Sequence, residues 1–170
     1  MRKISDIRWA KTLEGRPSFI RSTRLTGVCR EGLRYEKGLA KGLGAKFRHG
    51  VWWEYRDAGG VGYCQTDFLG RAKEWVIILE SKLTWTEEAE EQLHELYIPV
   101  VACALNIPRT QVLPIVVCKY LARGVQRPIC DTLREAVQSC ISVGSSEARS
   151  YTPVWHHIGR VPLISLAQAA

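Results

Sequence analysis

The sequence lacks the long hydrophobic runs that would suggest insertion into a membrane. No apolar stretch approaches about 18 residues, so we expect no transmembrane helix. No hydrophobic segment follows the basic N-terminal residues, so we expect no secretory signal. No two cysteines have CxxC spacing, and the six cysteines are widely separated, at positions 29, 64, 103, 118, 130 and 140. These absences favour reduced, buried thiols in a cytoplasmic protein over a disulfide or metal framework.

Negative charge is scarce in the first 30 residues. This segment contains two acidic residues against eight Lys or Arg, and so carries +6 of the net charge of +7. We expect a basic N-terminal arm at residues 1–30 and one folded domain at residues 31–170. Such an arm favours contact with a polyanion, most simply the phosphates of a nucleic acid such as DNA, over the alternative of a solvated tail. The candidate phosphate contacts are Arg2, Lys3, Arg8, Lys11, Arg16, Arg21, Arg24, Lys37 and Lys41.

The same segment is too apolar to be only a tail. Ile7, Trp9, Leu13 and Phe19 lie among its basic residues. Apolar side chains of this size are stabilised by burial, so we expect them to pack on another surface. A second copy of the chain is one such surface, which makes a homodimer a candidate assembly.

The most informative stretch spans residues 62–82. From Trp75 to Lys82 apolar residues occupy both faces of a period-two pattern, which predicts a strand buried on both sides. Glu80 and Lys82 end this strand on one face, although a buried charge requires a partner. A strand candidate at residues 61–69 carries Asp67, and an antiparallel hairpin would bring the three charged groups together. Two carboxylates and a lysine form an oxygen-rich site of the kind that Mg²⁺ or Mn²⁺ prefers.

Asp67, followed by Glu80, Ser81 and Lys82, resembles the motif of the PD-(D/E)XK nuclease superfamily. The resemblance covers residues 31–120, and Thr66 stands where the motif often has proline. It implies an α/β (α+β) restriction-endonuclease-like fold, with an αβββαβ core and a mixed central sheet flanked by helices. It also implies that Asp67, Glu80 and the Ser81 backbone carbonyl bind Mg²⁺ or Mn²⁺, and that Lys82 orients water or neutralises phosphate charge.

Two further site residues are implied by the resemblance. Glu36 lies on the inward stripe of a helix expected at residues 31–47, where the superfamily often has an acid aimed at the metal. The alternative is that Glu36 lies at the edge of this stripe and reaches solvent or Arg34. Gln92 resembles the glutamine of a Q…Y signature in the exonuclease-like branch, although Gln92 and Tyr97 are one residue further apart than usual.

The rest of the chain supplies the remaining elements of this core. A capping box at residues 84–87 predicts a helix that Pro99 should kink or end near Tyr97. A continuous apolar run at residues 111–121 predicts a central strand parallel to residues 75–82. The other expected elements are a strand at 51–56, a helix at 132–141 with Asp131 as N-cap, and a closing hairpin of 151–158 with 161–166.

Together these features predict a metal-dependent deoxyribonuclease, most simply an endonuclease, with no small-molecule cofactor. An exonuclease, a restriction-like enzyme and a phage-type junction resolvase in a bacterial or phage-infected cell fit equally well. A catalytically silent DNA-binding or assembly protein on the same fold is the main alternative. A small-molecule metallohydrolase is disfavoured by the basic first 30 residues. No residue of the site is predicted to read base edges, so no sequence specificity follows.

Overall fold

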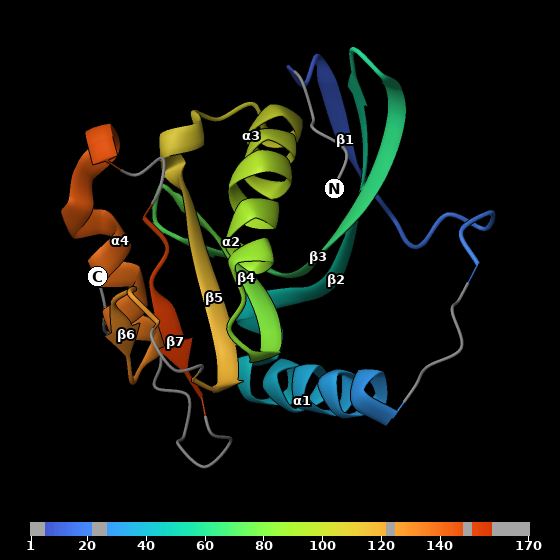
Figure 1. The fold of residues 1–170 in the computed structure, drawn as a ribbon. Helices are drawn as coiled ribbons and strands as arrows, with labels where there is room; N and C mark the ends of the chain where they lie inside the picture. The colour runs from blue at the N-terminus through green and yellow to red at the C-terminus, as the bar shows by residue number, and fades with distance from the viewer. Residues whose placement is uncertain (1–5, 22–26, 122–124, 148–150, 158–170) are drawn as a thin grey trace.

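A seven-stranded mixed sheet forms the centre of the protein, seen in a computed structural model (Figure 1). The structure describes residues 6–21, 27–121, 125–147 and 151–157. The strands are β1 (Trp9–Leu13), β2 (Phe47–Asp57), β3 (Gly60–Ala72), β4 (Trp75–Thr84), β5 (Val112–Tyr120), β6 (Ile129–Cys130) and β7 (Val154–His156), in the spatial order β1-β2-β3-β4-β5-β7-β6. The helices are α1 (Gly27–Leu43), α2 (Glu87–Gln92), α3 (Ile98–Leu105) and α4 (Leu133–Glu147); a π-helical turn (Leu93–Tyr97) joins α2 to α3, and short 3-10 turns span Gly44–Lys46 and Arg109–Gln111.

The direction of each strand follows from the length of the connection before it. Short turns join β2 to β3 and β3 to β4, and both pairs are antiparallel. The chain between β4 and β5 instead passes through α2 and α3, and β4 and β5 are parallel, as the sequence predicted. At the far side of the sheet, β7 lies parallel to both β5 and β6. The fold is therefore mixed α+β, with helices flanking a mixed sheet.

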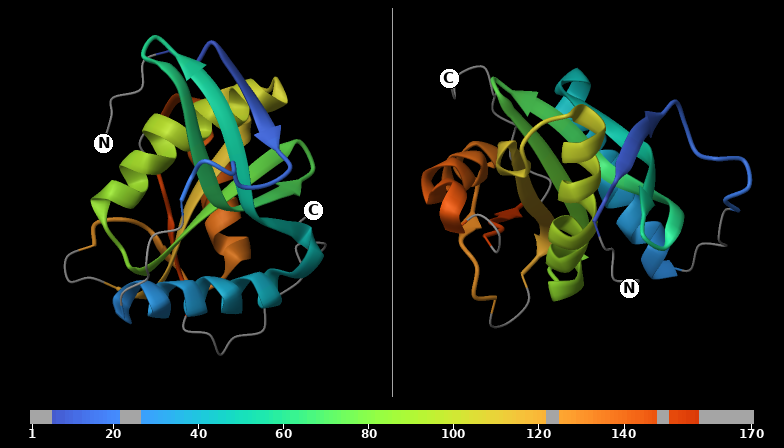
Figure 2. Two further views of the ribbon diagram at one scale, coloured as in Figure 1. Left: turned by 90° about the vertical axis from the view of Figure 1, so that its right-hand side faces the viewer. Right: turned by 90° about the horizontal axis from the view of Figure 1, so that it is seen from above.

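The sheet separates two hydrophobic cores, and β4 contributes to both. Val76 and Ile78 face the core that includes α3, whereas Ile77 and Leu79 face the core that includes residues of α1 and α4. Figure 2 shows α3 on one side of the sheet and α4 on the other. The prediction that residues 75–82 form a strand buried on both faces is confirmed.

The long β2–β3 hairpin contributes side chains to both cores, and the change from one core to the other occurs at Gly50 of β2. On one side of this glycine Phe47 packs in the core of α1 and α4, and on the other Trp53 packs in the core of α3. Gly50 has a positive φ of 65°, and a Cβ built there would lie 3.0 Å from Nε2 of Gln65. Glycine is favoured here because it accepts this backbone conformation and leaves room for the glutamine side chain.

Part of the basic N-terminal segment belongs to the sheet. β1 pairs antiparallel with β2 and forms one edge of the sheet, with Ala10 buried in the core of α3. The domain itself supplies part of the packing that the apolar residues predicted: Ile7 packs partly buried against this core and Leu13 is half-buried, whereas Trp9 stays exposed. Among the described residues, no helix has the length and apolar character needed to cross a membrane.

Several predicted boundaries were wrong. α1 begins at Gly27 and ends at Leu43, earlier than residues 31–47, because Gly44 with φ of 61° ends it and Phe47 already starts β2. The helix expected to kink or end near Tyr97 does not end there, because the π turn Leu93–Tyr97 continues directly into α3, whose first turn tolerates Pro99.

The C-terminal predictions also needed correction. The N-cap of α4 is Thr132 instead of Asp131: Thr132 Oγ1 accepts a hydrogen bond from the Glu135 N–H at 3.2 Å, while the Asp131 N–H donates to Glu135 Oε2 at 3.0 Å. β7 pairs in parallel with β5 and β6, and residues 161–166, the other half of the expected hairpin, lie outside the described residues.

Candidate functional site

Asp67 lies at the point where β3 and β4 stop pairing. The antiparallel register ends at Phe68 opposite Leu79, one residue before Asp67 and Glu80 would pair. Beyond it, Asp67 Oδ2 accepts hydrogen bonds from the Ser81 backbone N–H at 2.8 Å and the Ser81 hydroxyl at 2.7 Å. The carboxylate thus takes the place of a strand carbonyl. In an extended strand the N–H and C=O of one residue point to the same edge, so the Ser81 carbonyl also faces the Asp67 side.

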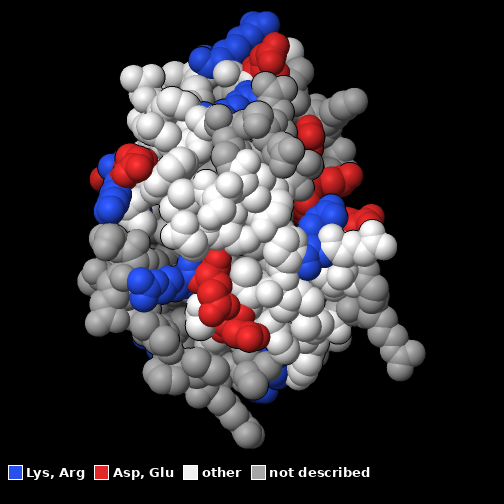
Figure 3. All heavy atoms as spheres, turned by 90° about the vertical axis from the view of Figure 1, so that its left-hand side faces the viewer, with Lys and Arg blue, Asp and Glu red and all other residues white. Residues whose placement is uncertain are grey.

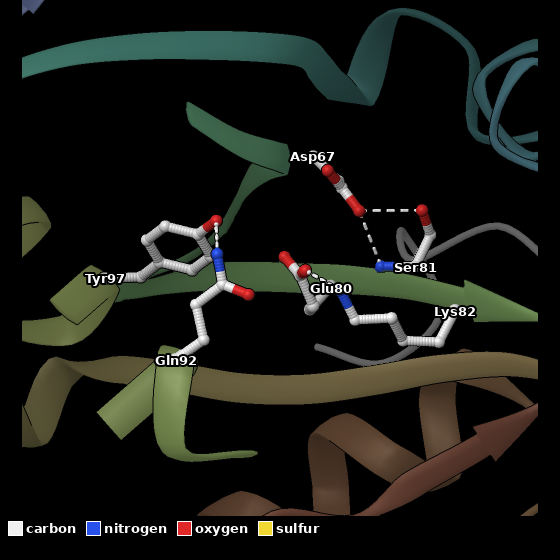
Figure 4. A network of polar contacts seen from close by, with 6 residues as sticks. All are labelled: Asp67, Glu80, Ser81, Lys82, Gln92 and Tyr97. Carbon is white, nitrogen blue, oxygen red and sulfur yellow. Dashed lines mark hydrogen bonds and ion pairs between the residues drawn. The ribbon is translucent and has the colours of Figure 1, made fainter. Parts of the chain in front are cut away.

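Glu80 is buried next to this opening, and one of its oxygens lacks a partner. Its Oε1 accepts a hydrogen bond and ion pair from Lys82 Nζ at 2.7 Å, across the face of β4. Its Oε2 is buried and has no hydrogen-bond partner within the described residues. Figure 4 shows the Asp67 and Glu80 side chains on the same side of β4. An unpaired buried carboxylate oxygen is costly, so this position favours a cation.

Burial and mutual charge shift the ionisation of these groups. Burial, followed by the nearby Asp67 carboxylate, raises the pKa of Glu80 to about 7, although the Lys82 ammonium opposes the shift. Burial alone would lower the pKa of Lys82, but Glu80 and then Asp67 raise it above its usual value, so Lys82 stays protonated. The site therefore holds a permanent cation beside a carboxyl group that ionises near neutral pH.

Glu36 reaches the same region from α1 and is paired with His49 of β2. Burial and the Asp67 carboxylate raise the pKa of Glu36, whereas the hydrogen bond from His49 lowers it. His49 Nε2 lies 2.6 Å from Glu36 Oε1, and its ring stacks on Phe68 at 5.1 Å between centroids. Neither solvent nor Arg34 is therefore the main partner of Glu36. Sequence reasoning missed His49, because its pairing depends on the angle between α1 and β2.

Gln92 and Tyr97 meet because the helix between them is a π turn. In an α-helix, residues five apart point in different directions, since neighbours on one face are three or four apart. Here the Ile98 N–H donates to the Leu93 carbonyl, an i→i+5 bond that fits one extra residue into the turn. Gln92 Nε2 donates a hydrogen bond to the Tyr97 hydroxyl (Figure 4). The additional residue that the sequence showed between Gln92 and Tyr97 is absorbed in this way.

A double-mutant cycle measures this contact. We expect Gln92→Ala and Tyr97→Phe to show a coupling of about 1 kcal/mol in the free energy of unfolding, because each change removes the same hydrogen bond. Urea denaturation of the four proteins gives the value. Tyr151→Phe is the control, because Tyr151 bonds to Ser139 of α4 instead. Coupling between Gln92 and Tyr151, or its absence between Gln92 and Tyr97, contradicts the assignment.

The donor set of the site suits a hard divalent cation only if water completes its coordination. Among the described residues, no group of three or more His, Cys, Asp or Glu side chains is arranged to hold a metal. Asp67, Glu80 and the Ser81 carbonyl instead offer oxygen atoms only. Mg²⁺ usually keeps several waters and uses one or two carboxylates, so this sparse, all-oxygen set with an unpaired Glu80 Oε2 fits it.

The predicted phosphate contacts are only partly described. Arg8, Lys11, Arg16, Arg21, Lys37 and Lys41 are exposed, whereas Arg2, Lys3 and Arg24 lie outside the described residues. Lys11 Nζ forms an ion pair with Glu54 at 3.3 Å, and the Arg16 guanidinium lies 6.0 Å from the Trp52 ring centroid. Lys37 and Lys41 are on α1, the helix that carries Glu36.

Comparison with known proteins gives little further information. No known protein family matches the chain, and neither does any curated protein. Among solved structures, the chain is similar to protein VC1899 from Vibrio cholerae, with 10% sequence identity and a TM-score of 0.42 over 78% of this chain. The chain spans 33% of the length of that protein. A similarity at this level carries no argument about function.

Proposed function

We propose that the protein is a metal-dependent deoxyribonuclease on a restriction-endonuclease-like core. The observation that carries the proposal is the buried, unpartnered Glu80 Oε2 beside Asp67, with Lys82 on the same strand face. The element order α1, β2, β3, β4, α2–α3, β5 agrees with the αβββαβ order of that fold. The placement of Asp67 on β3 and of Glu80 and Lys82 on β4, the two strands of one hairpin, also agrees with the motif.

Asp67, Glu80 and the Ser81 carbonyl would hold Mg²⁺ or Mn²⁺. When bound, such a cation lowers the pKa of a coordinated water and stabilises negative charge on a phosphoryl group. Asp67 is already oriented, because its Oδ2 accepts hydrogen bonds from both the backbone N–H and the hydroxyl of Ser81. Glu80 becomes the stronger ligand as it ionises near neutral pH, since burial raises its pKa to about 7.

Lys82 acts directly on the reacting groups. Its side chain is 33% exposed, so its ammonium can reach a phosphate oxygen or an attacking water while Glu80 holds it in place. Gln92 and Tyr97 form the neighbouring wall, and Glu36 with His49 closes the side toward α1. These residues would position the substrate and limit the entry of water.

The substrate we favour is DNA, and cleavage within the chain is the simplest outcome. The net charge of +7 supports binding to phosphate, and α1, which brings Glu36 to the site, also carries the exposed Lys37 and Lys41. The same geometry suits an exonuclease or a junction resolvase, and a homodimer remains part of the proposal. The charges would position the nucleic acid backbone without reading its sequence.

A cleavage assay tests the proposal. End-labelled linear duplex, single-stranded and four-way-junction DNA are incubated with the protein in Mg²⁺, Mn²⁺ or EDTA. We expect cutting of at least one substrate with either metal and none in EDTA. Cutting that persists in EDTA contradicts the metal site. Tight DNA binding with no cutting in either metal would instead favour the silent DNA-binding protein.

A further inference from the structure

The outward face of β1, β2 and β3 carries aromatic side chains in neighbouring rows. Trp9 pairs across the strands with Arg56, Lys11 with Glu54, and Leu13 with Trp52; Glu54 and Trp52 in turn pair with Tyr63 and Gln65 of β3. Paired residues in a sheet face the same side, so these residues share one face. Seen from this side, the three strands lie in front of α3 (Figure 2), and α3 packs on their other face, against Ala10 and Trp53.

Cations lie against the aromatic rings of this face. Lys11 Nζ is 5.4 Å from the centroid of Trp9 and the Arg56 guanidinium is 5.6 Å from it, and Arg16 lies over Trp52. Trp9 is 39% exposed. The single acid among these rows, Glu54, is already paired with Lys11. We call the set Trp9, Lys11, Arg16, Trp52, Arg56 and Tyr63 the aromatic strip.

The segment after β1 extends the aromatic strip. Phe19 packs edge-to-face on Tyr63 at 5.0 Å between ring centroids, yet it remains 65% exposed. A phenyl ring this exposed gains little from folding alone, since most of its surface stays in water. By contrast, the molecular face on the α4 side shows uncharged residues across its centre, with the described Lys and Arg scattered around them (Figure 3).

The aromatic strip leads into the candidate site along β3. Tyr63, Gln65 and Asp67 alternate along the strand and are partly exposed, whereas Cys64 and Thr66 between them are buried. Asp67 lies four positions after Tyr63, a distance of about 13 Å along a strand. A chain bound on the strip would therefore approach Asp67.

We propose that the aromatic strip binds a single-stranded segment of nucleic acid and guides it to Asp67. Bases of a single strand expose their flat faces and can stack on Trp9, Trp52 and Tyr63, while Lys11, Arg16 and Arg56 meet the phosphates. A duplex hides those faces inside its own stack, so it gains only the charge contacts. The inference rests on the proposed function only for what happens at Asp67, since binding on the strip needs no cleavage.

Binding is measured in EDTA, so that cleavage does not interfere. Fluorescence anisotropy is recorded with labelled 20-nucleotide oligo-dT, oligo-U and a 20-base-pair DNA duplex, using wild type, Trp9→Leu, Trp52→Leu and Arg56→Gln. We expect each tryptophan variant to bind oligo-dT or oligo-U about five-fold or more weakly, with little change for the duplex. Arg56→Gln should reduce the slope of log K against log salt by about 0.7. The two oligomers distinguish DNA from RNA as the preferred strand.

The control variants alter the same kinds of side chain, one apolar and one arginine, at positions outside the aromatic strip. Ile129→Ala alters an exposed apolar residue on β6, at the opposite edge of the sheet, and Arg134→Gln alters an arginine on α4. Both should bind as wild type does.

Quenching of tryptophan fluorescence by oligo-dT should be smaller in Trp9→Leu than in wild type. This measurement tests stacking directly, even if the substitution also lowers affinity by destabilising the fold. Equal binding by wild type and both tryptophan variants, or equal affinity for single strand and duplex, contradicts the proposal that the aromatic strip binds single strands. Strip-dependent binding without metal-dependent cutting would overturn the nuclease proposal and leave the strip intact.

Discussion

Lys82→Ala is expected to cut DNA between about a hundredfold and ten-thousandfold more slowly than wild type, the range for loss of one group that acts on the reacting atoms. The reason is that Lys82 is the cation that Glu80 holds at the site, and its side chain is 33% exposed, so under the proposed function it can reach the substrate. The fold should survive the change. Glu80 already has a raised pKa, and without the opposing charge of Lys82 it would take up a proton instead of remaining a buried anion.

The structure supplies a closely matched control for this variant. Lys119, near the end of the adjacent strand β5, is also 33% exposed and also forms an ion pair, with Glu31 at 3.2 Å. Lys119→Ala should cut DNA at close to the wild-type rate. Asp67→Asn should lose activity as Lys82→Ala does, while its amide oxygen can still accept the Ser81 hydrogen bonds. If Lys82→Ala cuts within a few-fold of wild type, Lys82 has no role in the reaction.

Glu80→Gln is expected to stabilise the metal-free protein at pH 8, by about 3 kcal/mol at most. The pKa of Glu80 is about 7 in the folded protein against an ordinary value of 4.5. The folded state therefore favours the protonated acid, and the stability that this provides is complete below pH 4.5 and is lost as pH rises through 7. A glutamine cannot ionise, so it avoids this loss. The two proteins should differ little at pH 5 and most at pH 8.

Urea denaturation in EDTA at pH 5 and pH 8 measures the effect. Glu90→Gln is the contrasting variant, because Glu90 is also buried but both of its oxygens bond to Arg127, at 3.1 and 2.9 Å. Breaking that pair should destabilise the protein at both pH values. Added Mg²⁺ should raise the urea midpoint of wild type but not of Glu80→Gln. A ligand that binds only the folded state stabilises that state, and Glu80→Gln lacks one of the proposed metal ligands. A Glu80→Gln protein less stable than wild type at pH 8 contradicts the burial argument.

The elements that the sequence predicted best are those whose pattern is local. The two-faced apolar strand at residues 75–82 and the parallel strand after the crossover follow from periodicity and connection length, and both are confirmed. The approach of Asp67 to residues 80–82 also followed from a short hairpin. These predictions needed no information about distant parts of the chain.

The features that sequence reasoning missed depend on packing between distant segments or on small choices of backbone. The pairing of His49 with Glu36 requires α1 to pack beside β2, which no spacing in the sequence encodes. The π turn competes with an ordinary α-helix at the same residues, and its i→i+5 hydrogen bond from Ile98 to Leu93 cannot be read from the spacing of the side chains. The two-residue strand β6 forms only because β7 is there to pair with it.

The unequal pairing of β4 on its two sides has a consequence for access. Toward β5 its ladder continues past the site to Thr84 opposite Tyr120, whereas toward β3 it stops at Leu79. The two strands of the hairpin thus separate beyond Leu79, and the Asp67 carboxylate lies between them at the point of separation. Under the proposed function, the scissile phosphate reaches the site from the open side between β3 and β4, because backbone pairing between β4 and β5 closes the other side.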